Sequence, residues 1–367
     1  MPHLFEPLRL RGVTFANRIG VSPMCQYSSE DGFANDWHFA HLAARAIGGA
    51  GLIFTEAAGV TPEGRISPED LGVWSEKHFE PLERITRFIH QQGSIAGIQL
   101  AHAGRKASTF RPWSGAGEVT PDKGGWQVLG PSPEPFADTY PKPKELTVAE
   151  IGKLQDAFVT AAKRSVDAGF RVIEVHGAHG YLFHEFYSPL SNRRTDQYGG
   201  SFENRTRFLR DTVAAVRKAL PDNIVLFVRL SCTDWTEGGW DIAQSVELAK
   251  QLKALGADVI DASSGGNVSN AKIPIGAGYQ TPFAERIRRE AGIATAAVGL
   301  ITDAAQADQL IRNGQADFAL LARELLRDPY WPLHAAEELG VKASWPAQYL
   351  RAAPSGSPER VPAHEMD

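Results

Sequence analysis

Short apolar runs rich in β-branched residues recur along the chain and alternate with longer segments of helical periodicity. Near-continuous apolar strands are typical of a parallel sheet that is covered on both faces. The helical pattern is clear over residues 147–168 and 201–219, and Thr147 with Glu150 matches a capping box. Eight strand–helix alternations predict an α/β fold, a single (β/α)8 TIM barrel, with a doubly wound open sheet as the alternative. The predicted strands span residues 17–24, 51–58, 94–101, 171–176, 224–231, 258–264, 294–299 and 317–322.

Two segments lie outside this alternation. Residues 104–146, rich in Gly, Pro and Trp, are expected to form a long insert after the third strand, and loops of this length are usually functional or mobile. Residues 352–367 have the composition of a disordered tail. We therefore expect a single catalytic domain over residues 1–351, followed by a disordered C-terminal tail over residues 352–367.

Composition narrows the class of protein. The chain has 367 residues, of which 43% are hydrophobic and 22% charged, so it can bury a large core. Its net charge of −5 argues against nucleic acid or an anionic membrane as a partner. We see no signal peptide and no apolar run near the roughly 20 residues that a membrane span needs. Cys25 and Cys232 are too few for a disulfide framework or an iron–sulfur cluster, so we expect a cytoplasmic protein.

Polar residues gather where the predicted strands end. In a (β/α)8 barrel the active site lies at the C-terminal ends of the strands, where purely structural residues would mostly be small or apolar. Six polar strand ends in register therefore imply a site that takes a small molecule. They are Met24-Cys25-Gln26-Tyr27, Gln99 with His102, His176 with His179 and Tyr181, Arg229, Ser263-Ser264-Gly265-Gly266, and Arg323.

The densest of these strand ends carries His176, His179 and Tyr181. Two imidazoles can donate hydrogen bonds to one carbonyl oxygen, and a tyrosine can deliver a proton nearby. A metal site is disfavoured, because no third histidine or carboxylate is suitably spaced and the surroundings are not acidic. On these residues alone, structural histidines held by internal hydrogen bonds remain the alternative.

The same stretch resembles a known family. The run H-x-A-H-G-Y-L begins at His176, and S-P-x-x-N-x-R-x-D-x-Y-G-G-S-x-E-N-R begins at Ser188; together they resemble the signature of the Old Yellow Enzyme family. The resemblance covers nearly the whole chain. Cys25 and Tyr27, with histidine at both 176 and 179, are similar to the bacterial thermophilic-like subclass, which includes xenobiotic reductases. Further matching segments are Leu4-Phe5-Glu6-Pro7, Pro23–Tyr27, Gln99–Lys106 and Tyr349-Leu350-Arg351.

This resemblance implies noncovalent FMN at the barrel mouth. Gln99 would pair with the pyrimidine edge of the flavin, and Arg229 would lie near N1, where its charge stabilises the anionic reduced ring. Where the family usually has Gly-Arg, this chain has Ala322-Arg323, a change that keeps the backbone N–H. The residues implied to line the isoalloxazine are Pro23, Met24, Cys25 and Ala58, and those implied at the phosphate are Gly265, Gly266, Val298, Gly299, Ala322 and Arg323.

The resemblance also implies a reaction. NADPH or NADH would reduce the flavin and leave, which fits the absence of a complete G-x-G-x-x-G motif after a strand. A hydride would then pass from flavin N5 to the β-carbon of an activated alkene. His176 and His179 would bind its carbonyl or nitro oxygen, and Tyr181 would protonate the α-carbon. Tyr27 would contact the substrate, and Arg351 would reach the neighbouring subunit's site, which implies a homodimer or homotetramer.

Three other functions share parts of this pattern and are the alternatives to the one that the resemblance implies. Larger barrel relatives such as dienoyl-CoA reductases and amine dehydrogenases carry an iron–sulfur cluster and further domains, a layout that two cysteines and 367 residues exclude. A flavin-binding redox sensor would use Cys25 as its switch, but it would not need the complete set His176, His179 and Tyr181. A phosphate-binding barrel without flavin is the third.

Overall fold

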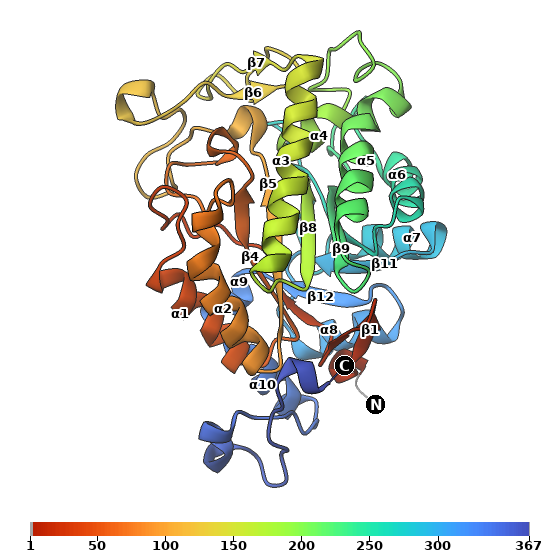
Figure 1. Ribbon diagram of the computed structural model, residues 1–367. Helices are drawn as coiled ribbons and strands as arrows, with labels where there is room; N and C mark the ends of the chain where they lie inside the picture. The colour runs from red at the N-terminus through yellow and green to blue at the C-terminus, as the bar shows by residue number, and fades with distance from the viewer. Residues whose placement is uncertain (1–2, 367) are drawn as a thin grey trace.

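Eight parallel strands close into a barrel in the computed structural model, which describes residues 3–366 (Figure 1). The order around the barrel is β10-β11-β12-β3-β4-β5-β8-β9, so the closed TIM barrel is confirmed and the open sheet is excluded. Every barrel strand falls within or next to a predicted one. The strands are β3 (Ile19–Val21), β4 (Leu52–Gly59), β5 (Ile95–Ala101), β8 (Val172–Gly177), β9 (Val225–Ser231), β10 (Val259–Ser263), β11 (Ala294–Val298) and β12 (Phe318–Leu321).

Helices surround the barrel (Figure 1). The predicted helices are observed as α3 and α5, and the capping box is present, with Thr147 Oγ1 accepting from the Glu150 N–H and Glu150 Oε2 accepting from the Thr147 N–H. The helices are α1 (Asp36–Ile47), α2 (Phe79–Gln91), α3 (Val148–Asp167), α4 (Leu182–Tyr187), α5 (Phe202–Ala219), α6 (Ile242–Ala254), α7 (Thr281–Ala291), α8 (Ala304–Arg312), α9 (Arg323–Arg327) and α10 (Trp331–Glu338). Within residues 3–366, none of them is long and apolar enough to cross a membrane.

Alternation of side chains along the strands divides the barrel interior into an apolar and a polar part. Phe54, Phe227 and Phe318 come from strands that are not neighbours, yet their rings meet across the interior, at 5.5 Å for the first two and 5.7 Å for the last two. Because every second residue of a strand points to the same side, β8 directs Glu174 and His176 to the same side as the core residue Val172. The upper interior is therefore polar, and it lies at the carboxyl ends of the strands.

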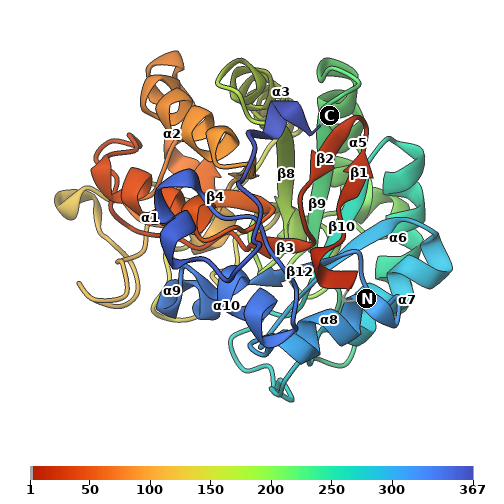
Figure 2. The same cartoon turned by 90° about the horizontal axis from the view of Figure 1, so that it is seen from below.

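A hairpin that the sequence analysis missed closes the amino-terminal end of the barrel. Strands β1 (Leu8–Leu10) and β2 (Val13–Phe15) pair antiparallel, and Figure 2 shows them crossing that end. Phe15 is fully buried, with its ring 5.0 Å from that of Phe318. In the sequence, Arg11-Gly12 between two short alternating runs is the pattern that indicates such a hairpin. In the structure both residues have positive φ, as a two-residue hairpin turn requires.

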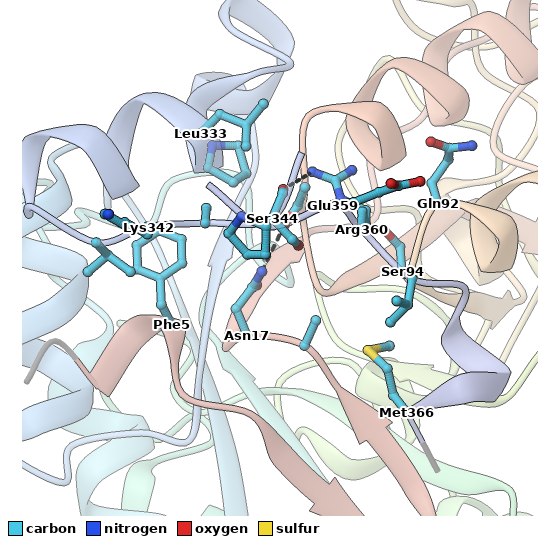
Figure 3. Close-up of a pocket in the computed structure, with 18 residues that line it drawn as sticks. Phe5, Asn17, Gln92, Ser94, Leu333, Lys342, Ser344, Glu359, Arg360 and Met366 are labelled. Carbon is cyan, nitrogen blue, oxygen red and sulfur yellow. Dashed lines mark hydrogen bonds between the residues drawn. The ribbon is translucent and has the colours of Figure 1, made fainter. Parts of the chain in front are cut away.

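The C-terminal segment differs from the expected disordered tail. Residues 352–366 return to the barrel, where Arg360 donates hydrogen bonds of 2.8–2.9 Å to the carbonyls of Ala46, Ile47 and Ser344. Ala363, in the 3-10 helix η7 (Ala363–Glu365), is only 4% exposed in the core of the barrel's lower end. A cavity of about 270 Å³ lies between this segment and the strand starts (Figure 3). Arg360 and Ala363 anchor the segment. A prediction from average composition does not detect the contribution of two single residues.

The segment after β5 extends over the carboxyl ends of the strands, at the top of Figure 1. Its first turn is fixed to the barrel, because the Arg105 N–H donates to Glu185 Oε1 at 2.8 Å and the Arg105 guanidinium donates to the Asn267 carbonyl at 2.8 Å. The structured parts are η4 (Gly104–Lys106), η5 (Pro121–Lys123), β6 (Leu129–Gly130) and β7 (Lys144–Glu145).

Candidate active site

Three predicted catalytic side chains meet at the end of β8. The His176 ring lies 5.2 Å from the His179 ring and 5.1 Å from the Tyr181 ring, both in edge-to-face arrangements. His176 is still within β8, whereas Tyr181 is the residue before α4, so a short turn folds the three together. The structure thus brings them close enough to contact one bound group.

His179 is held in an unusual backbone conformation. Its φ of +61° lies in the left-handed region, which a side chain with a Cβ adopts only at an energetic cost. Its N–H donates to Ser231 Oγ at 2.9 Å, and its carbonyl accepts from Lys106 Nζ at 2.8 Å. Its ring Nε2 lies 2.7 Å from Ser263 Oγ. Contacts from three other parts of the chain therefore fix both the backbone and the ring.

Both imidazoles are neutral. Burial, with the nearby charge of Arg229 as the second cause, lowers the pKa of His176 and of His179 well below the usual range. His176 Nδ1 accepts a hydrogen bond of 3.3 Å from the Ala178 N–H, so the single ring proton is on Nε2. His176 therefore presents an N–H donor, which is the form needed to bind an oxygen atom.

Tyr181 keeps its phenolic proton. Burial raises the pKa of Tyr181 well above its ordinary value, and the neighbouring ionisable groups of Cys25, Tyr27 and Asp70 act in the same direction. Lys106 Nζ lies 5.1 Å from the centre of the Tyr181 ring, and burial lowers the pKa of Lys106 to about 8. A protonated phenol beside two neutral imidazoles can act as a proton donor.

Cys25 and Tyr27 follow β3 on the other side of the mouth. Burial raises the pKa of the Cys25 thiol well above its usual value, reinforced by Asp70 and Glu56, so the thiol is protonated. Tyr27 has a φ of +51°, and its ring packs edge-on against Trp113, 5.8 Å away. A protonated thiol is a poor nucleophile, which argues against a role for Cys25 in covalent chemistry or rapid redox switching.

Beneath the histidines lies a polar cluster that we call the floor, made of Gln99, Glu174, Arg229 and Asp261. All four are at most 5% exposed. Gln99 Nε2 donates to Glu174 Oε1 at 2.7 Å, and Arg229 Nε lies 2.9 Å from Asp261 Oδ2. Buried polar groups are costly unless they are paired, so the floor is a built feature of the interior.

A cavity of about 210 Å³ opens beside the floor, between the ends of β11 and β12. Gly299 has a φ of +124°, and a Cβ there would come within 2.8 Å of Gln280 Nε2, so only glycine leaves this cradle open. Gln280 is itself held by the Val298 carbonyl at 2.8 Å. A glycine cradle with arginines is the arrangement expected for a phosphate. The predicted residues that line the cavity are Arg229, Val298, Gly299, Ala322 and Arg323.

Gly265 and Gly266 lie outside this cavity, which corrects their predicted role. The Gly265 N–H donates to the Thr233 carbonyl at 2.8 Å, so it is not free for a phosphate. Gly266 instead packs against the histidine turn, where a Cβ would approach the His179 carbonyl oxygen to 2.6 Å. A Cβ on Gly180 would likewise come within 2.1 Å of the Gly266 carbonyl oxygen. Gly180 and Gly266 thus allow two loops to touch, a requirement that the family resemblance did not reveal.

The remaining predicted residues fall into two groups. Pro23 and Met24 are partly exposed after β3, and Ala58 is buried in β4 opposite Leu100, so these three border the mouth. Arg351 does not: it is exposed in the 3-10 helix η6 (Ala347–Ala352), in the segment after α10 at the bottom of Figure 1.

Several residues of the site had no role assigned to them from the sequence. Lys106 and Ser263 hold His179, Gln280 shapes the phosphate cradle, and Glu174 and Asp261 form half of the floor. For Glu174 and Asp261 the sequence does contain an indication, because each is an acidic residue in the middle of an apolar strand, VIEVH and VIDAS respectively. Within residues 3–366 there is no group of three or more His, Cys, Asp or Glu side chains that could hold a metal ion.

The barrel, the phosphate cradle and the pair of neutral imidazoles define a flavin-dependent oxidoreductase. Residues 3–341 match the NADH:flavin oxidoreductase / NADH oxidase family, and the chain belongs to it. Gln99, Arg229 and the cradle at Gly299 fit FMN, which is the cofactor of this family. The protein is thus an FMN-dependent nicotinamide oxidoreductase of the Old Yellow Enzyme type.

Known proteins similar to the chain agree with this assignment. It is 50% identical to an NADPH dehydrogenase of Geobacillus thermodenitrificans, over 95% of this chain and 98% of the relative. It is 46% identical to an NADPH dehydrogenase of Bacillus subtilis, with the same coverage.

Solved structures show the same fold. Morphinone reductase in complex with tetrahydroNAD has a TM-score of 0.77 at 26% identity, covering 94% of this chain and 93% of that one. A 2-naphthoyl-CoA reductase has a TM-score of 0.83 at 24% identity, and this chain spans 53% of its length.

The cradle at Gly299 yields a direct test. Gly299→Ala places a methyl group 2.8 Å from Gln280 Nε2 in a left-handed backbone, so we expect FMN affinity to fall roughly tenfold or more, about 1.4 kcal/mol. Fluorescence titration of flavin-free protein with FMN measures this. Gly340→Ala is the matched control, because Gly340 also has positive φ but no atom lies within 4 Å of its Cβ position. Equal FMN affinity in both variants would contradict the cradle.

Proposed function

We propose that this enzyme uses NADPH, or NADH, to reduce activated C=C bonds of α,β-unsaturated carbonyl and nitro compounds. One observation carries the proposal: above the floor, the neutral His176 ring lies 5.2 Å from the neutral His179 ring and 5.1 Å from the protonated Tyr181 ring. An activated alkene needs such a set, because reduction adds a hydride to one carbon and a proton to the other. FMN, when bound, supplies the hydride.

The two histidines are proposed to bind the substrate oxygen on which negative charge develops. His176 offers its Nε2–H, since Nδ1 already accepts from Ala178. For His179, whose Nε2 lies 2.7 Å from Ser263 Oγ, we assign the ring proton to Nδ1 as the second donor, with the Ser263 hydroxyl turned toward Nε2 and away from its longer 3.4 Å contact with Gln280 Oε1. Preorganised donors of this kind stabilise a developing oxyanion more than they stabilise the neutral substrate.

Tyr181 is proposed to deliver the proton to the α-carbon. Its raised pKa keeps the phenol protonated, and its ring, 5.1 Å from that of His176, supports a role beside the oxygen that His176 is proposed to bind. The enzyme then recovers the proton from solvent.

Two finer points rest on the relatives and on the cysteines. NADPH is favoured over NADH because relatives up to 50% identical are named NADPH dehydrogenase. A cytoplasmic location is supported by Cys25 and Cys232, which are both free thiols.

Replacing the phenol tests the proton donor. Tyr181→Phe should leave flavin reduction by NADPH nearly unchanged, while flavin reoxidation by an enone slows roughly 10²–10⁴-fold, as expected for loss of a positioned acid. Stopped-flow absorbance of the two half-reactions separates these steps. Tyr187→Phe is the control, because Tyr187 is a fully buried tyrosine bonded to backbone carbonyls. Equal slowing of both half-reactions by Tyr181→Phe would assign Tyr181 a structural role.

Removing one imidazole tests the oxyanion site. His176→Ala and His179→Ala should each slow enone turnover roughly 10²–10³-fold, the usual loss for one oxyanion donor. A phenol carries a similar oxygen, so its dissociation constant, measured from the flavin absorbance change, should rise in both variants. Ser263→Ala should weaken phenol binding less, because only the orientation of the His179 ring is lost. Unchanged phenol affinity in both histidine variants would refute the site.

We further propose that the enzyme is a homodimer or homotetramer in which Arg351 completes the neighbouring subunit's site beside Tyr27. Arg351 is exposed, and its segment lies at the opposite end of the barrel from the insert (Figure 1). This position supports contact with a neighbouring subunit's site, because Arg351 is remote from the site of its own chain. A planar guanidinium suits substrate oxygens or nicotinamide phosphates.

Kinetics and mass together test this arrangement. Arg351→Ala should raise the KM for enone or NADPH several-fold, about 1–2 kcal/mol of lost binding, without changing FMN content. Light scattering should give the mass of a dimer or tetramer. Arg289→Ala is the matched control, since that arginine is 68% exposed on α7. A fully active monomer would exclude the shared site.

A further inference from the structure

The floor holds more acid than base. Glu174 and Asp261 are both 0% exposed, while Arg229 is the floor's single cation. The histidine above them does not supply a second charge, because burial and Arg229 keep the pKa of His176 low. Two ionised carboxylates would leave one negative charge uncompensated in the dry interior, which is strongly unfavourable.

The hydrogen-bond partners of the two carboxyl groups indicate the same excess of negative charge. With both groups ionised, Glu174 Oε2 and Asp261 Oδ1 lack a hydrogen-bond donor in the part of the chain that the structure describes, and Asp261 Oδ2 has only the 2.9 Å ion-pair contact with Arg229 Nε, which is not aligned as a hydrogen bond. The other Glu174 oxygen accepts from Gln99 Nε2 at 2.7 Å. The Glu174 and Asp261 side chains lie in hydrogen-bonding contact with each other, so one proton placed between them would satisfy an oxygen on each.

We propose that Glu174 and Asp261 share a single proton, with the negative charge on Asp261 against Arg229 and with Glu174 as the neutral acid. The proposal rests on the FMN site described above. Neutral Glu174 then has two contacts: Oε1 accepts from Gln99, and Oε2–H donates to Asp261. The floor is electrically neutral, and Glu174 is a positioning residue for the Gln99 amide.

Electrostatics supports this distribution of the proton. Burial raises the pKa of Glu174 well above its ordinary value, and the neighbouring Asp261 raises it further, against the opposing effect of Arg229. Burial also raises the pKa of Asp261, but Arg229 at 2.9 Å counteracts it, so Asp261 ionises first.

The arrangement has two consequences for the cofactor. One Gln99 amide hydrogen is used by Glu174, so the amide oxygen and the second hydrogen are what Gln99 can offer to the flavin. The Arg229 charge, balanced by Asp261, stabilises reduced flavin less than a free guanidinium would. Glu174 and Asp261 together therefore set the equilibrium between oxidised and reduced flavin.

A double-mutant cycle tests the shared proton. In Glu174→Gln the introduced amide can donate to Asp261 and accept from Gln99, so the charge on Asp261 survives. In Asp261→Asn the introduced amide can donate to Glu174, which then ionises. Each single variant should shift the oxidised–reduced flavin equilibrium, measured against a reference dye, less than about threefold. The double variant removes the only negative charge, so it should favour reduced flavin by roughly tenfold or more.

Additive shifts would overturn the proposal. If both carboxylates were ionised, each single variant would remove one charge and by itself favour reduced flavin by roughly tenfold. The single variants alone decide this point even where the double variant does not fold. Asp317→Asn is the matched control, because Asp317 pairs with Arg288 before β12, away from the floor, and it should cause no shift.

Infrared spectroscopy tests the proton independently of FMN. The difference spectrum of wild type minus Glu174→Gln should show the carbonyl stretch of one buried carboxylic acid that the variant has lost, while the bands of other buried acids such as Glu185 and Asp70 cancel. No such band in the difference spectrum would overturn the shared proton. Failure of the wild-type protein to bind FMN would instead refute the cofactor site, while the infrared result on the carboxyl pair would stand.

Discussion

The structure depends on the alternation of side chains along eight parallel strands that close into a barrel. A closed barrel gives every strand one face toward the interior and one toward the helices, so each strand contributes to both. On β8 the interior series runs from Val172 through Glu174 to His176, that is, from the apolar core to the floor and then to the site. The same periodicity that builds the core also delivers the polar groups.

The polar upper interior requires compensation, and the fold supplies it through pairs across neighbouring strands. Gln99 on β5 meets Glu174 on β8, and Asp261 on β10 is opposite Arg229 on β9 in the strand register. These pairs reduce the cost of burying charge near the cofactor. They also leave Arg229 as a cation of defined position, the property that an electron-accepting ring needs nearby.

Catalytic geometry is set by contacts that are remote in sequence. His179 adopts a left-handed backbone because Ser231, Ser263 and Lys106 hold it from three directions, and Gly180 and Gly266 let the loops approach. Strain of this kind persists only where the surroundings over-determine the conformation. The result is a preorganised imidazole pair, as the proposed binding of a substrate oxygen requires.

The sequence by itself determined the eight barrel strands, the capped helix α3, and the meeting of His176, His179 and Tyr181, because these follow from local periodicity and from a short spacing after one strand. Through the family resemblance it also grouped Gly299 with Arg323, and both line the cavity beside the floor. The same resemblance implied a phosphate role for Gly265 and Gly266, but it does not reveal that the Gly265 N–H is already bonded or that Gly266 packs against the histidine turn. Average composition failed for the C-terminal segment, which Arg360 and Ala363 anchor.

Tertiary structure alone decided the floor, the cradle and the clamp on His179. Ser263 lies 84 residues from His179, and Glu174 lies 75 residues from Gln99, so no spacing rule joins them. Their contacts arise from barrel closure and strand register, which bring side chains together across strands. Local sequence patterns specify what each strand presents, and closure of the barrel specifies which groups meet and therefore which charges and protons they share.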